Sequence, residues 1–89
     1  MDSKEHTILI EPFISVNGKS IYFYPGVDDF GRVVAKLDFV DKNANYKFAK
    51  YEDRSIEYVM QDPSIEEVEV IITDVLRHEI HKKTLQLEN

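Results

Sequence analysis

The sequence predicts a single α+β domain: a five-stranded antiparallel meander with one C-terminal amphipathic helix packed on a face of the sheet. Two observations support this fold class. The segments before residue 61 are rich in β-branched and aromatic residues, with apolar and polar residues alternating in residues 32–39, whereas apolar residues recur with a helical period between residues 65 and 80. Eighty-nine residues suit one small hydrophobic core. We therefore expect residues 1–89 to form one domain, with residues 1–6 as a flexible tail.

The first two strands are predicted in the β-rich runs on either side of Asn17-Gly18. Asn-Gly favours a two-residue hairpin turn, because both residues tolerate a left-handed backbone. That turn sets Ile14 opposite Ile21 and makes both faces of the hairpin apolar or aromatic. We therefore expect the hairpin to be covered on both sides.

Three further strands are predicted in segments rich in β-branched and aromatic residues, namely 32–40, 46–51 and 55–60. A short loop would set Phe39 against Phe48. The next turn would set Phe48 beside Val59 and Lys50 beside Glu57, a pair of opposite charge. These pairings predict a meander in which strands that are consecutive in sequence are neighbours in the sheet.

The last segment, residues 64–83, is predicted to be the helix. One helical stripe collects most of its apolar residues, namely Ile65, Val68, Ile71, Ile72, Val75, Leu76 and Ile80. Only Val70 lies clearly off this stripe. Ser64 and Glu67 match a capping box, and acids precede bases along the segment, as a helix dipole prefers. The β-branched run VEVIIT is the competing signal for a strand. We favour the helix because the cap, the stripe and the charge order are independent signals.

Composition limits the classes of function. The chain has no cysteine, which excludes disulfides and thiolate metal sites. Its first ten residues resemble neither a signal peptide nor a membrane span, so we expect a cytoplasmic protein without membrane contact. A net charge of −6 opposes non-specific attraction to nucleic acid. Nucleic-acid binding through Lys47 and Lys50, which are interleaved with aromatic residues, stays an alternative.

One segment carries oxygen side chains at the spacing of a calcium-binding EF-hand loop, namely Asp41, Asn43, Asn45 and Glu52. Tyr46 occupies the place where that loop needs glycine, and both flanks alternate as strands rather than helices. Asp and Asn are also common turn residues, so we interpret the segment as a turn. Calcium binding stays an alternative.

Two histidines stand close together near the C-terminus. His78 and His81 would share one side of a helix, with Asp74 one turn earlier as a third ligand for zinc. The sequence HEIH, residues 78–81, is one residue short of the zinc-protease motif HExxH. We interpret them as solvated residues at a helix end and predict no metal site, with zinc as an alternative.

No nucleophile, base and oxyanion donor can be named together, so the sequence predicts neither catalytic residues nor a cofactor. The most distinctive feature is an acidic stretch from residue 52 to 74, which would attract a basic protein surface. Its candidate partner-binding residues are Glu57, Asp62, Glu66, Glu67, Glu69 and Asp74. We predict a small non-catalytic protein-interaction module that binds a basic partner or its own copy as a homodimer. A phage or mobile-element inhibitor that imitates nucleic-acid charge is a sharper form of this hypothesis.

Overall fold

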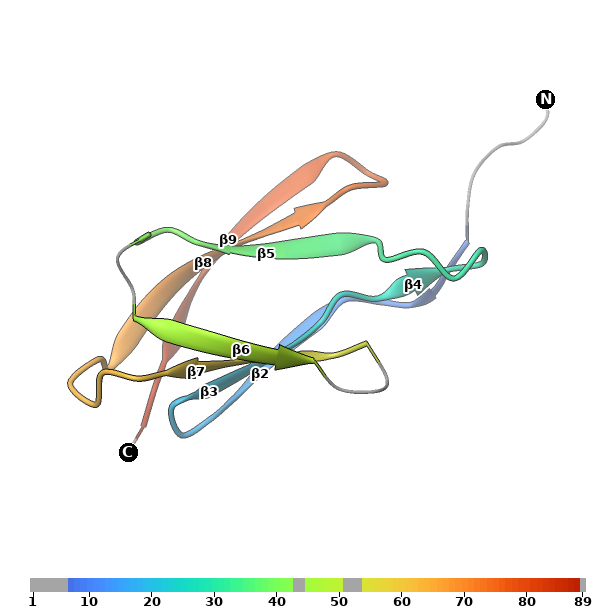
Figure 1. The fold of residues 1–89 in the computed structure, drawn as a ribbon. Coiled ribbons are helices and arrows are strands. Elements are labelled where there is room, and N and C mark those ends of the chain that lie inside the picture. Colours follow the sequence, from blue (N-terminus) through green and yellow to red (C-terminus); the bar gives the residue numbers. More distant parts are fainter. Residues whose placement is uncertain (1–6, 43–44, 51–53, 89) are drawn as a thin grey trace, which may run out of the picture.

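The computed structural model is all-β, and it describes residues 7–42, 45–50 and 54–88. Its strands are β1 (Ile8–Ile10), β2 (Phe13–Asn17), β3 (Ser20–Tyr24), β4 (Val27–Asp28), β5 (Ala35–Phe39), β6 (Tyr46–Lys50), β7 (Ile56–Met60), β8 (Glu67–Asp74) and β9 (Glu79–Gln86). They form a four-stranded sheet β2-β3-β7-β6, a three-stranded sheet β5-β8-β9 and a ribbon β1-β4 (Figure 1). None of the described residues is helical, so this part of the chain contains no helix that could cross a membrane. The predicted α+β class is wrong.

The segment predicted as a helix forms the hairpin β8–β9. Val68 and Val70 are buried and Glu69 between them is exposed, which is the period of a strand. Ile72 pairs with Leu37 on the inner face, and its neighbour Ile71 lies on the outer face. Ile71 and Ile72 lie on opposite faces of the strand, but in a helix both would lie on the apolar stripe. This ambiguity explains why the sequence favoured a helix. The β-branched run decided the structure, because these stiff side chains pack well on a pleated sheet.

The hairpin β2–β3 is confirmed, but its turn is displaced by one residue. Asn17 pairs with Ser20, so Gly18 and Lys19 form the turn, and Gly18 has a φ of +63°. The pairing therefore shifts by two residues from the expected one, and Ile14 lies opposite Phe23. A shift of two keeps every side chain on its predicted face. The face away from the other sheet is not fully covered, since Phe13 is 50% exposed.

The meander prediction is wrong because β5 and β6 belong to different sheets. β5 pairs with β8, whereas β6 forms the predicted hairpin with β7. In that hairpin Phe48 lies opposite Tyr58 and Lys50 opposite Ile56, one residue away from the expected register. Lys50 and Glu57, the residues of opposite charge that favoured the other register, therefore do not lie directly opposite each other. Packing of the inner face decided the register instead, since a slip of one residue would turn β7 over.

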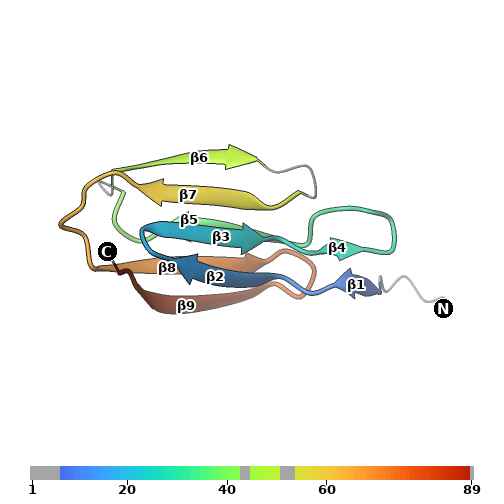
Figure 2. The same ribbon diagram turned by 90° about the horizontal axis from the view of Figure 1, so that it is seen from below.

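The hydrophobic core lies between the two larger sheets. Its buried members come from both layers and are Ile21, Phe23, Ala35, Leu37, Phe39, Met60, Val68, Val70 and Leu87. When one sheet is viewed in front of the other, β2 and β3 lie over the three-stranded sheet, and β7 and β6 extend past its β5 edge (Figure 2). The four-stranded sheet therefore overhangs β5.

The ribbon β1–β4 projects at one end of the sandwich (Figure 1). It ends in a tight turn organised by Asp28, whose side chain is inaccessible to solvent. The Asp28 carboxylate accepts hydrogen bonds from the backbone N–H groups of Phe30 (2.9 Å) and Arg32 (2.8 Å), and from Arg32 Nε (2.9 Å). Burial raises the pKa of Asp28, but these hydrogen bonds and the Arg32 charge outweigh it and hold the pKa below its ordinary value.

Candidate protein-binding groove

The acidic residues proposed as a partner-binding surface do not share one face. Glu57 lies on the outer face of the four-stranded sheet, because it pairs with Tyr22 there. Glu67 and Glu69 are exposed on the outer face of the three-stranded sheet, on the opposite side of the sandwich. Asp74 is buried at the end of β8. No single flat partner could contact all of them.

Two of these acidic side chains accept hydrogen bonds from groups of the same chain. Asp62 Oδ1 accepts hydrogen bonds from Ser64 Oγ (2.7 Å) and from the Ser64 N–H (2.9 Å), and these bonds lower the pKa of Asp62. Asp74 Oδ1 accepts from the N–H groups of Leu76 (3.0 Å) and Arg77 (2.9 Å) and so shapes the turn between β8 and β9. Ser64, expected to cap a helix, belongs to a loop.

The predicted histidine geometry is lost with the helix. His78 lies in the β8–β9 turn with a φ of +59°, and His81 lies on β9 with its Nε2 3.4 Å from Glu79 Oε1. Asp74, the third ligand considered, is committed to the turn. Among the described residues no three His, Asp or Glu side chains gather as a metal site would require.

The segment that resembles an EF-hand loop follows β5 and includes the whole of β6, so its residues 46–50 form a strand rather than a loop. β5 ends at Phe39 and β6 begins at Tyr46, so neither flank of the described part is helical. Asp41 and Asn45 are exposed there, whereas Asn43 and Glu52 lie outside the described residues. The strand before the segment, β5, and the strand within it, β6, belong to different sheets, an arrangement unlike the helix pair that holds an EF-hand loop.

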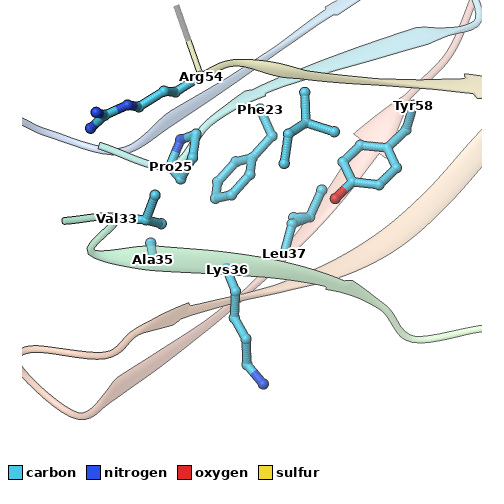
Figure 3. A pocket seen from close by; sticks show the side chains of 9 residues that line it. Phe23, Pro25, Val33, Ala35, Lys36, Leu37, Arg54 and Tyr58 are labelled. Carbon is cyan, nitrogen blue, oxygen red and sulfur yellow. The ribbon is translucent and has the colours of Figure 1, made fainter. Parts of the chain in front are cut away.

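A groove of about 380 Å³ lies beneath the overhang of β7 (Figure 3). Its walls come from strands of both sheets and from the segments that lead into them, namely Phe23, Pro25, Val33, Ala35, Lys36, Leu37, Arg54, Ile56 and Tyr58. Most of these side chains are apolar. Lys36 contributes little besides its backbone, since its ammonium group points away from the groove (Figure 3). The volume falls in the range of ligand-binding pockets.

The two ends of the groove differ in chemistry. At one end the guanidinium of Arg54 lies above Pro25 and Val33, and its Nη1 donates a hydrogen bond to the carbonyl of Gly31 (2.6 Å; Figure 3). At the other end Tyr58 belongs to an aromatic cluster, with its ring centroid 5.2 Å from that of Phe39. Burial raises the pKa of Tyr58, and the nearby Tyr46 and Asp38 raise it further, so the hydroxyl keeps its proton.

The floor of the groove is the open edge of β5. Val40 N–H donates to the Glu69 carbonyl (3.0 Å), and Val75 N–H donates to the Val34 carbonyl (2.9 Å). Antiparallel pairs alternate, so the even-numbered residues of β5 exchange hydrogen bonds with β8. Ala35, Leu37 and Phe39 therefore direct their N–H and C=O groups to the opposite side. In the described part of the chain no strand pairs with β5 on that side.

Sequence reasoning missed this groove because it placed β5 in the middle of one sheet. The alternation of buried Ala35, Leu37 and Phe39 was visible, and it identifies one buried face. It carries no information about which strands lie alongside. No protein-family model, curated protein or solved structure matches the chain.

Proposed function

We propose that this chain is a non-catalytic protein-interaction module whose partner occupies the groove between β5 and the overhanging β7. One observation carries the proposal: an apolar groove lies directly beside a strand edge whose backbone groups have no strand partner in the described residues. Such edges pair readily with other chains unless they are covered or protected. We keep the cytoplasm as its expected compartment, because the chain has no cysteine and needs no oxidising environment.

This proposal changes the binding surface and keeps the class of function. Because the acidic residues are divided between two faces, the proposal rests on the groove and not on imitation of nucleic-acid charge. The groove is apolar, and the Arg54 guanidinium lies at one end of it. The partner is therefore bound mainly by apolar contacts and by hydrogen bonds between backbones. The acidic surface then contributes to solubility and to the rate of encounter with the partner.

The test is selection of binders from a displayed library of random heptapeptides, followed by affinity measurement with two matched variants. Val33 lies in the groove and is 48% exposed, and Val75 lies outside it and is 44% exposed, so Val33→Glu and Val75→Glu should both fold. We expect Val33→Glu to weaken binding of the selected peptides at least about tenfold, the loss of one buried apolar contact, and Val75→Glu to leave it unchanged. Failure to select any peptide that is sensitive to Val33→Glu would refute the proposed function.

A further inference from the structure

We infer that the partner enters as a single extended segment that pairs antiparallel with β5 and becomes the fourth strand of the three-stranded sheet. The inference rests on the proposed function and specifies how the groove is used. Addition of a strand to an open edge is a common way of recognising a peptide: backbone hydrogen bonds supply affinity, and pockets for alternate side chains supply specificity.

The lining of the groove favours one added strand, because Ile56 and Tyr58 of β7 line it and it therefore lies beneath that strand. Four strands in one layer face three in the other, and β7 and β6 are the strands that extend past β5 (Figure 2). One strand beside β5 would give each layer four. The edge of a second sandwich is two layers thick, so a second copy of this chain would collide with β6 and β7. A helix hydrogen-bonds its own backbone groups, so it would leave the N–H and C=O groups along the β5 edge without partners.

The backbone of β5 determines the side-chain pattern of the segment. Ala35, Leu37 and Phe39 direct their backbone groups toward the groove, and their side chains lie on the inner face. Residues of an added strand directly opposite these three would also place their side chains on the inner face. These side chains would fill the groove against Phe23 and Ile56 and should be apolar. The intervening residues face outward and can be polar.

The charge at one end determines the direction of the segment. Arg54 lies at the end of the groove beside Val33, which precedes β5. An antiparallel strand finishes at that end, where its terminal carboxylate or an acidic side chain would meet the guanidinium. Arginine is suited to this role because its planar fork matches a carboxylate. The segment is therefore an alternating apolar strand that ends in an acid.

The experiment uses a synthetic peptide in which valine alternates with threonine and the last residue is an aspartate with a free carboxylate. On binding, the amides of Leu37 and Phe39 should gain protection from hydrogen exchange, because they acquire hydrogen-bond partners. N-methylation of the central valine that pairs with β5 should weaken binding about tenfold, the loss of one hydrogen bond. Replacing the acidic end with asparagine amide should weaken it about two- to fivefold, and this difference should vanish in Arg54→Gln.

Each contrary result overturns a different statement. Library peptides that bind in a manner sensitive to Val33→Glu, without protecting Leu37 and Phe39, would refute strand addition and leave the proposed function intact. Failure of the alternating peptide while library peptides bind would refute the stated sequence pattern. Ultracentrifugation that shows a dimer abolished by Val33→Glu would identify a second copy as the occupant and refute the single segment.

Discussion

Val70→Ala distinguishes the strand at β8 from the helix that the sequence favours. In the helical interpretation Val70 lies off the apolar stripe, and its truncation should cost little. In the structure Val70 is 0% exposed between the two sheets. The substitution removes two methyl groups worth about 0.8 kcal/mol each in transfer, and the cavity left behind raises the expected loss to about 2–3 kcal/mol.

The free energy of unfolding can be measured by urea titration followed by far-UV circular dichroism, since the chain has no tryptophan. The loss corresponds to a fall in Tm of about 10–20 °C for a domain of this size. Glu69→Ala is the matched control, because the Glu69 side chain precedes Val70 on β8 and is exposed on the other face of the sheet. We expect it to change the free energy of unfolding by no more than about 0.5 kcal/mol. A Val70→Ala loss no larger than that of Glu69→Ala would refute the packing described for β8.

Three further predictions concern turns and close contacts. The pKa of Asp28 is lowered in the folded state, so its ionised carboxylate stabilises the fold fully above the unfolded pKa of about 3.9, and this contribution is lost as the pH falls through the lower folded value. Asp28→Asn should therefore be less stable at neutral pH and lose less stability in acid, and urea midpoints with the same pH dependence as the parent would contradict this. Gly26→Ala should cost about 2–6 kcal/mol by thermal or urea unfolding, because Gly26 has a φ of +78° and an added Cβ would lie 2.5 Å from the Ile10 carbonyl oxygen. Gly18→Ala, where the nearest atom is 3.6 Å away, should cost only about 1–2 kcal/mol, and equal losses would exclude the contact as the cause. His78→Gly should stabilise the protein by about 1 kcal/mol, because it relieves a φ of +59°, whereas the same change inside a helix would destabilise it.

Local patterns predicted the hairpins better than they predicted the sheets. Asn17-Gly18 identified the first hairpin correctly, because a left-handed glycine is a local requirement that the sequence states directly. The register depended on a second choice, whether Asn17 or Lys19 joins Gly18 in the turn, and neighbouring strands decided it. The β6–β7 register went wrong for the same reason, since a single pair of opposite charges is weaker than the packing of an inner face.

The helix error and the missed groove share a physical cause. Residues 64–83 satisfy a helical stripe and, less obviously, a strand period, and only the opposite sheet decides which apolar side chains become buried. Val70 shows this: it is off the stripe and yet completely buried. The groove depends on β5 choosing β8 rather than β6 as its partner, a contact more than thirty residues away along the chain. Alternation within β5 is the same for either choice.

Hydrogen exchange of the β5 amides in the free protein tests most directly whether this strand has an open edge. Lys36 and Asp38 face β8 and should exchange slowly, together with Val40, whose N–H donates to the Glu69 carbonyl. Leu37 and Phe39 face the groove and should exchange faster, which would give an alternating profile along the strand. Uniformly slow exchange from residue 36 to 40 would mean that the edge is already paired, and it would contradict both the groove and the strand that we propose to fill it.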